Sequence, residues 1–190
     1  MRRAVQAEGA PSSDYDLNPD VSPPKRMLRP AAVLIAAFDN GERCDLILTR
    51  RASGLRHHAG QIAFPGGKVD PGDEGPQAAA LREAREEIGL DESDVEPIGF
   101  LPEHETVTGF LVKPVLGWVN QPFTPMAEAG EVAEIFSVPL SHVLDLANYQ
   151  VESRFFRGAR RRYYVVPYGP YYIWGATARM LRTLAERAQA

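Results

Sequence analysis

The stretch "FPGGKVDPGDEGPQAAALREAREEIGL", residues 64–90, changes character halfway along its length. Its first half is rich in Gly and Pro, which are typical of turns, and its second half is rich in strong helix formers. The second half predicts a helix over about residues 77–88, with Asp73 as an acidic start and Gly89 as a stop. We therefore expect a glycine-rich loop that leads into a helix.

Three carboxylates gather on one side of this expected helix. Glu83, Glu86 and Glu87 are related as i, i+3 and i+4, so their side chains project in the same direction. Adjacent like charges on a helix cost roughly a few tenths of a kcal/mol per pair. One explanation is a solvated face on which Arg82 and Arg85 balance the charge. The other is a bound divalent cation, because Mg2+ prefers carboxylate oxygens and turns the repulsion into attraction.

The loop before the helix favours the second explanation. The segment "PGGKVDPGDE", residues 65–74, contains glycines that let backbone groups approach an ion or a phosphate closely. A phosphate-bearing substrate bridged by Mg2+ to the row of glutamates accounts for both the loop and the helix. The sequence thus indicates metal-dependent chemistry on a phosphate group.

Short apolar runs predict a sheet around this helix. The runs "AAVLIAAF" (31–38) and "CDLILTR" (44–50) flank an Asn-Gly pair, a strong hairpin signal, so two antiparallel strands are expected there. Further strands are expected at residues 61–64, 96–101, 111–119, 131–139 and 161–168, and further helices at residues 139–147 and 176–190. The expected fold class is α+β or α/β, with a mixed β-sheet sandwiched between α-helices.

Length and composition indicate one globular domain. Residues 1–29 are polar and rich in Ser, Asp and Pro, so they predict a flexible leader before a domain at residues 30–190. The longest apolar run, residues 31–38, is too short to span a membrane, and the net charge of -4 argues against nucleic-acid binding. The single cysteine, Cys44, fits a cytoplasmic location. The oligomeric state stays open, with a homodimer among the alternatives.

A basic segment precedes the glycine-rich loop. The run "LTRRASGLRHH", residues 48–58, contains Arg50, Arg51, Arg56, His57 and His58. A solvated basic loop is the plain interpretation of such a run. Guanidinium groups also make bidentate contacts to phosphates, so the segment is a candidate for binding a small anionic substrate.

The helix and its loop resemble the Nudix box, whose pattern is G-x5-E-x7-R-E-U-x-E-E-x-G-U, with U apolar. The second half of the pattern is matched by Arg82, Glu83, Ala84, Glu86, Glu87, Gly89 and Leu90. The first half departs from it by one inserted residue, because counting from Gly67 reaches Asp73 at the glutamate position. The resemblance implies the Nudix fold and a hydrolase that cleaves a diphosphate with Mg2+ or Mn2+.

Two further segments resemble the coenzyme A pyrophosphatase branch of the family. They are "ILTRRASGLRHHAGQIAFPGG" (47–67) and "YYIWGATARML" (171–181), and the inserted residue also resembles this branch. The resemblance implies cleavage of coenzyme A or its derivatives to 3',5'-ADP and 4'-phosphopantetheine or its acyl form. Two alternatives stay open: a Nudix enzyme for ADP-ribose or NADH, and a non-catalytic Nudix-like module that binds a nucleotide.

The candidate metal ligands come from the helix and the loop. Glu83 and Glu87 lie four residues apart and are the expected direct ligands, and the resemblance implies the trio that includes Glu86. The backbone carbonyl of Gly67 is a further candidate. Arg82 is expected to orient a glutamate through a charge-assisted hydrogen bond.

The candidate catalytic and substrate-binding residues extend beyond the metal ligands. Glu86 and Arg82 are expected to act in catalysis, and Glu131 follows a loop from which a general base can reach the site. Glu103 and Glu105 compete with Glu131 for that role. The expected substrate-binding residues are Arg51, Arg56, Gly66 and Lys68.

Overall fold

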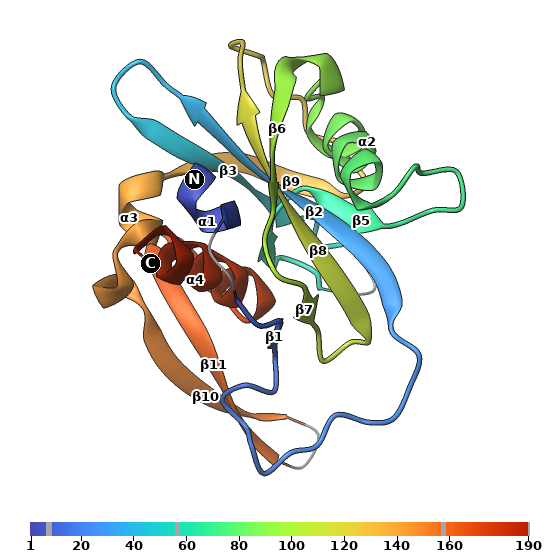
Figure 1. Ribbon diagram of the computed structural model, residues 1–190, viewed down its shortest axis with the longest axis vertical. Helices are drawn as coiled ribbons and strands as arrows, with labels where there is room; N and C mark the ends of the chain where they lie inside the picture. The colour runs from blue at the N-terminus through green and yellow to red at the C-terminus, as the bar shows by residue number, and fades with distance from the viewer. Residues whose placement is uncertain (7–8, 56–57, 157–158, 190) are drawn as a thin grey trace.

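The computed structural model describes residues 1–6, 9–55, 58–156 and 159–189, which form two sheets and four α-helices (Figure 1). The helices are α1 (Arg2–Gln6), α2 (Pro76–Ile88), α3 (Leu140–Leu144) and α4 (Ala176–Gln189). The larger sheet contains β1 (Ser12–Ser13), β2 (Arg29–Asp39), β3 (Cys44–Arg51), β4 (Ile62–Ala63), β5 (Gly66–Lys68), β6 (Val95–Phe100), β7 (His104–Glu105), β8 (Phe110–Val119) and β9 (Val132–Pro139). The smaller sheet contains β10 (Gln150–Phe156), β11 (Ala159–Tyr168) and β12 (Tyr171–Trp174). Within the described residues, no helix is both long and apolar enough to cross a membrane.

Strand β2 lies at the centre of the larger sheet, and its neighbours run in both directions. It pairs parallel with β8 and antiparallel with β3 and β5. The β2–β3 pair is the hairpin predicted around Asn40 and Gly41, with Phe38 opposite Asp45. Gly41 has a φ of 89°, a backbone angle that glycine adopts readily. The mixed sheet predicted from the sequence is therefore confirmed.

Helices cover both faces of the larger sheet. Helix α2 lies against one face, where Ala80, Ala84 and Ile88 are fully buried, and α3 and α4 lie against the other face (Figure 1). Successive side chains of a strand point to opposite faces, so Leu34 of β2 packs on the α2 side and Ile35 on the α4 side. Burial on both faces explains why residues 31–38 of β2 form a continuous apolar run.

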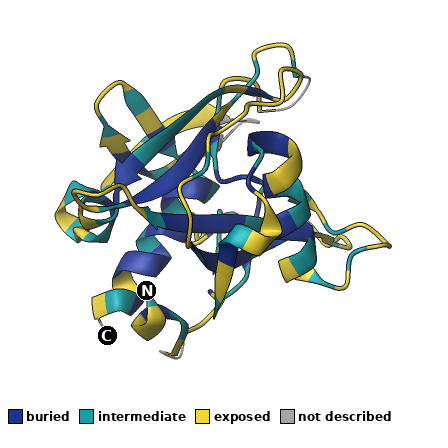
Figure 2. Ribbon diagram, turned by 90° about the horizontal axis from the view of Figure 1, so that it is seen from above, coloured by how far each residue is buried: buried dark blue, intermediate teal, exposed yellow. Residues whose placement is uncertain are grey.

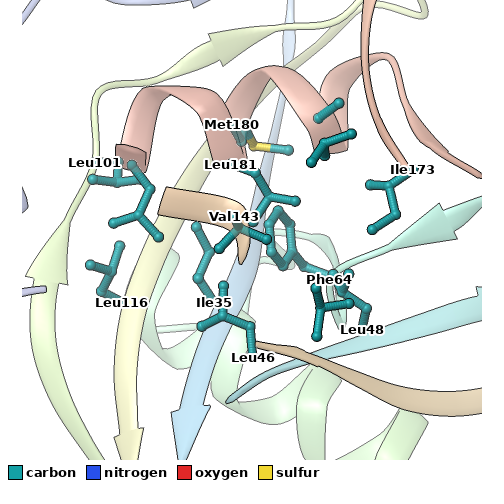
Figure 3. Close-up of a cluster of buried hydrophobic side chains, with 14 of the residues drawn as sticks. Ile35, Leu46, Leu48, Phe64, Leu101, Leu116, Val143, Ile173, Met180 and Leu181 are labelled. Atoms are coloured by element: carbon teal, nitrogen blue, oxygen red, sulfur yellow. The ribbon is translucent and has the colours of Figure 1, made fainter. Parts of the chain in front are cut away.

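The C-terminal helix α4 covers the core on the face of the larger sheet opposite α2. Figure 3 shows Met180 and Leu181 of α4 gathered with Val143 of α3 and with apolar residues of the larger sheet. Buried residues lie on the inner sides of the elements and exposed residues on the outer sides (Figure 2). Thr177 donates a hydrogen bond of 2.9 Å from Oγ1 to the carbonyl of Ile62, which ties the first turn of α4 to β4. The amphipathic helix predicted at the C-terminus is confirmed.

The smaller sheet differs from the prediction. Its strands pair antiparallel in the order β10-β11-β12, whereas the sequence predicts a strand only at residues 161–168. Strand β10 escapes the pattern because Glu152 and Arg154 alternate with Val151 and Phe155, and all four side chains are exposed. The sheet packs against α4 and shares the core on that side of the molecule (Figure 1).

Part of the segment before residue 30, expected to be a flexible leader, packs against the folded domain. Helix α1 buries Ala4, and β1 pairs parallel with β7. His104 is fully buried, with Nδ1 2.9 Å from Ser12 Oγ and Nε2 3.1 Å from Asp14 Oδ1. Ser12 is only 4% exposed, so this Ser–His–Asp row holds the segment to the sheet and is not open to a substrate. The domain boundary itself stays a prediction.

Candidate active site

Helix α2 begins and ends through its backbone. It starts at Pro76 after Gly75, which makes no side-chain capping hydrogen bond, so Asp73 does not cap the helix as expected. Gly89 ends it in the left-handed conformation with a φ of 71°, and its N–H donates to the carbonyl of Arg85. The predicted stop is confirmed, and the predicted start lies one residue too late.

Arg82 is the centre of an ionic network on α2. Its guanidinium donates to both carboxylate oxygens of Asp73 at 2.9 and 3.0 Å. It also donates to Glu83 Oε1 and to Glu86 Oε2, each at 3.1 Å, and to the carbonyl of Lys68 at 3.2 Å. The bidentate bond holds the pKa of Asp73 below its usual range. Arg82 therefore orients two of the three glutamates, as the sequence predicts, and Asp73 in turn orients Arg82.

Asp73 is a site residue whose partner the sequence reasoning missed. The sequence places it before the helix, where an acid is expected to help start the helix, and its carboxylate instead binds Arg82. The available signal was the inserted residue of the loop, which leaves Asp73 at the glutamate position counted from Gly67 but one residue farther from Arg82 than the pattern has it. Asp73 also accepts a hydrogen bond of 2.7 Å from the N–H of Asp70, which closes the loop on itself.

Glu87 is a buried carboxylate that faces the glycine-rich loop. It is 4% exposed, and its Oε2 accepts a hydrogen bond of 3.1 Å from the N–H of Gly66. Arg51 Nη1 lies 3.6 Å from Glu87 Oε1. Burial raises the pKa of Glu87 to about 7, the Gly66 N–H and Arg51 oppose this shift, and the charges of Glu83 and Glu131 reinforce it. Gly66, expected to bind substrate, uses its N–H to orient Glu87.

Glu83 lies directly against the backbone of the loop. A Cβ atom added at Gly67 would overlap with the Glu83 carboxylate, so only a glycine leaves that space free. Burial raises the pKa of Glu83, Arg82 opposes this shift, and the charges of Glu86 and Glu131 reinforce it. Glu83 and Glu87 thus form a half-enclosed region of concentrated negative charge beside Gly66 and Gly67.

The residues around Glu83 and Glu87 suit a hard divalent cation in their chemistry. Carboxylate oxygens and a backbone carbonyl are the donors that Mg2+ and Mn2+ prefer. In the part of the chain that the structure describes, no three His, Cys, Asp or Glu side chains converge closely enough to hold a metal as they stand. Arg82 engages Glu83 and Glu86 instead. An ion would therefore draw these carboxylates from Arg82, while Asp73 retains the guanidinium.

Of the three candidate bases, Glu131 lies where its charge acts on the site. It precedes β9 and raises the pKa of both Glu83 and Glu87. Glu103 pairs instead with Lys113, with 3.8 Å between Oε1 and Nζ, and Glu105 belongs to β7.

The loop before Glu131 is fastened to the end of α2. The N–H of Met126 donates to the carbonyl of Ile88, and the N–H of Glu128 donates to the carbonyl of Glu87, each at 3.0 Å. These carbonyls have no partner within the helix, because they belong to its last turn. The loop therefore completes the end of the helix that carries the glutamates.

The predicted substrate residues are only partly brought to the site. Arg51 reaches Glu87, and Lys68 has an exposed side chain next to the loop. Arg56 and His57 lie outside the described residues. His58 is exposed, and its Nδ1 lies 2.7 Å from Gln61 Oε1.

The raised pKa of Glu87 predicts a pH dependence of stability in the metal-free protein. An unfolded glutamate titrates near about 4.3, whereas folded Glu87 holds its proton up to about pH 7. Between these values the folded state binds more protons, so this group contributes stability at low pH that is lost as the pH rises. The melting temperature of the wild type relative to Glu87→Gln, measured with a chelator, is expected to fall from about pH 4.3 to about pH 7. Glu92→Gln, on the exposed turn after α2, serves as the control that keeps the wild-type slope. A flat difference between the wild type and Glu87→Gln would contradict the interpretation.

Comparison with known proteins assigns the chain to a family. The sequence profile described as NUDIX domain matches residues 27–158, well over half of the chain. The protein named "Uncharacterized Nudix hydrolase NudL" from Citrobacter koseri is 44% identical over 169 residues, which cover 89% of this chain and 88% of that protein. The protein of the same name from Cronobacter sakazakii is 43% identical over 169 residues, with 89% and 88% covered. The chain therefore belongs to the Nudix family.

Solved structures agree on the fold. The NUDIX domain of Shewanella oneidensis NrtR, solved as a complex with ADP ribose, has a TM-score of 0.54 at 15% identity, with 92% of this chain and 97% of that chain covered. A MutT/nudix family protein from Enterococcus faecalis has a TM-score of 0.56 at 14% identity, with 89% and 65% covered. These two likenesses show the Nudix fold alone. Together with the family match and the relatives, they identify the protein as a Nudix hydrolase, a class that generally uses divalent metal ions.

Proposed function

We propose that this Nudix hydrolase cleaves the diphosphate of coenzyme A or its derivatives in the cytoplasm, giving 3',5'-ADP and 4'-phosphopantetheine or its acyl form. One observation carries the proposal. Arg51 belongs to the segment that resembles the coenzyme A branch, and its guanidinium lies 3.6 Å from Glu87 in the carboxylate site. The segment associated with substrate choice and the helix associated with catalysis therefore meet at this contact.

The proposed metal ligands are the carboxylates of Glu83 and Glu87, with Glu86 and the carbonyl of Gly67 as additional donors. Mg2+ or Mn2+ supplies charge neutralisation at the diphosphate and promotes ionisation of a water molecule when bound. The burial of Glu87 and the close contact of Glu83 with Gly67 support this assignment. A bound cation would favour the ionised form of Glu87, which burial alone disfavours.

The remaining residues orient the carboxylates, accept a proton and bind the substrate. Arg82, held by Asp73, orients Glu83 and Glu86 beside the loop, and both carboxylates would turn from Arg82 toward a bound ion. Glu131 is the proposed general base that accepts a proton from the attacking water. The water oxygen bonds to phosphorus, and the bond from phosphorus to the leaving phosphate oxygen breaks. Arg51, together with Lys68 and Arg56, is proposed to bind the substrate phosphates.

A substrate panel tests the proposal. Coenzyme A, dephospho-coenzyme A, ADP-ribose and NADH are incubated with the enzyme and Mg2+ or Mn2+, and the products are separated by chromatography. We expect coenzyme A to have the highest kcat/KM, because the guanidinium groups of Arg51 and Arg56 are proposed to bind its 3'-phosphate, which the other three compounds lack. Faster cleavage of all three other compounds would reject coenzyme A in favour of a different Nudix substrate. Nucleotide binding without cleavage of any compound would instead indicate a non-catalytic module.

A further inference from the structure

Strand β10 forms an edge of the smaller sheet and is largely exposed. The strand order is β10-β11-β12, and among the described strands β10 pairs with β11 alone (Figure 1). Val151 is 53% exposed and Phe155 is 77% exposed, although both are large apolar residues in a regular strand. An edge strand presents N–H and C=O groups to any further strand, and short charged edges usually prevent such pairing. This edge carries exposed apolar side chains beside its charges, so it is a candidate surface for pairing with another strand.

We infer that β10 pairs antiparallel with β10 of a second copy of this chain, with Ser153 at the two-fold axis. The smaller sheets of the two copies would then join into one continuous sheet. The partner is a second copy because the strand is complementary to itself in this arrangement and in no neighbouring one. The inference concerns assembly and is independent of the substrate proposal.

Backbone geometry limits how two β10 strands can pair. In an antiparallel sheet, alternate residues of a strand turn their N–H and C=O groups toward the same neighbour. Two edge residues that face each other must therefore both be of the outward-turned kind, or both of the other kind. The two-fold axis must therefore place one residue of β10 opposite the same residue of the partner. Registers in which the axis falls between two successive residues are excluded.

The charges of β10 choose among the allowed centres. A centre at Glu152 places two glutamates opposite each other, and a centre at Arg154 places two arginines opposite each other. A centre at Ser153 places Glu152 opposite Arg154 of the partner subunit, and the symmetry repeats this pair. Opposite charges across strands stabilise a sheet, and like charges directly opposite destabilise it.

The side chains of Glu152 and Arg154 lie on one face of the smaller sheet, and each would turn from its present contact with β12 to pair across the interface. Glu152 Oε2 accepts a hydrogen bond of 2.6 Å from Tyr172, and the Arg154 guanidinium lies 4.3 Å from the centre of the Trp174 ring. Both contacts cross the same face of the sheet, which keeps the two charged groups on that face. Within its own hairpin, Arg154 lies opposite Arg161.

The apolar residues of β10 lie on the opposite face and are matched in the same register. Val151 faces Phe155 of the partner subunit when Ser153 is at the axis. Within one copy, Val151 lies opposite Tyr164, which packs against the core. The new contact would therefore extend an existing apolar surface and remove two exposed apolar side chains per copy from water. Charge and burial favour the same register.

Complementary charge variants test the interface. Arg154→Glu places two glutamate pairs across the interface, and Glu152→Arg places two arginine pairs there. Each variant alone is expected to raise the dimer dissociation constant by roughly tenfold or more. A mixture of the two variants restores opposite charges at both positions, so it is expected to form a heterodimer. Sedimentation velocity of the wild type, each variant and the mixture over a dilution series measures these outcomes.

Two controls separate the interface from other causes. Arg3→Glu makes the same change of charge on the exposed surface of α1 and is expected to leave the wild-type dimer intact. Circular dichroism of each variant reports whether the fold is retained. A wild type that stays monomeric, or a mixture no more dimeric than its two folded components, would overturn the inference.

Discussion

Replacing Glu83 or Glu87 with glutamine is expected to lower turnover by roughly 10^2- to 10^3-fold, the range seen when one group that stabilises transition-state charge is removed. Glutamine keeps the shape of the side chain and an oxygen that can accept the Gly66 N–H, but it lacks the charge that attracts a cation. The buried position of Glu87 raises its pKa, so a neutral side chain there removes an unfavourable charge. We therefore expect Glu87→Gln to fold normally and to lose function.

The measurement combines activity with metal binding. Steady-state hydrolysis of the preferred substrate gives kcat, and calorimetric titration with Mn2+ gives the metal affinity of the same protein. Glu92→Gln carries the same chemical change on an exposed turn just after α2, so it should retain both values. Undiminished turnover in folded Glu83→Gln and Glu87→Gln would contradict the assignment of the metal site to this face of α2.

Replacing Gly67 with alanine is expected to lower kcat by about a hundredfold, the effect of moving a catalytic group by about 1 Å. The added Cβ would overlap with the Glu83 carboxylate, which is the free end of a flexible side chain. The carboxylate can move away without disturbing the backbone, so the fold is retained and the catalytic geometry is lost. Circular dichroism and thermal unfolding check the fold, and the hydrolysis assay checks the activity.

The neighbouring glycine provides a contrast. A Cβ at Gly66 would overlap with the backbone carbonyl of Ala32, and Gly66 has a φ of 155°. Because a backbone in β2 cannot yield as a side chain does, Gly66→Ala is expected to reduce stability as well as activity. If Gly67→Ala kept wild-type kcat, then the position of Glu83 beside the loop would not matter for catalysis.

The sequence was sufficient where a short pattern decides the structure by itself. The two short apolar runs and the Asn40-Gly41 turn predict the β2–β3 hairpin, because turn chemistry and strand propensity act locally. Gly89 predicts the end of α2 for the same reason. The helical spacing of Glu83 and Glu87 likewise places both carboxylates on one side before any tertiary contact is known.

The sequence was insufficient where distant segments decide the structure. The bond between Asp73 and Arg82 depends on how the inserted loop folds back over α2, and no local pattern encodes that path. The contact between Arg51 and Glu87 joins β3 to α2 across the sheet. His104 binds Ser12 and Asp14, which lie about ninety residues away, as the separations of 92 and 90 show. Such pairings depend on topology, and a single sequence without structural context does not specify them.

The two backbone hydrogen bonds between the 120–131 loop and the end of α2 determine where this loop tolerates a change of length. Met126 and Glu128 are held at the carbonyls of Ile88 and Glu87, so extra residues before Met126 can bulge outward without moving the rest of the loop. An insertion between Glu128 and Glu131 has no such freedom, and it would displace Glu131 from the glutamates of α2. Among enzymes that share these two hydrogen bonds, loop length should therefore vary before the position of Met126 and stay constant between Glu128 and Glu131.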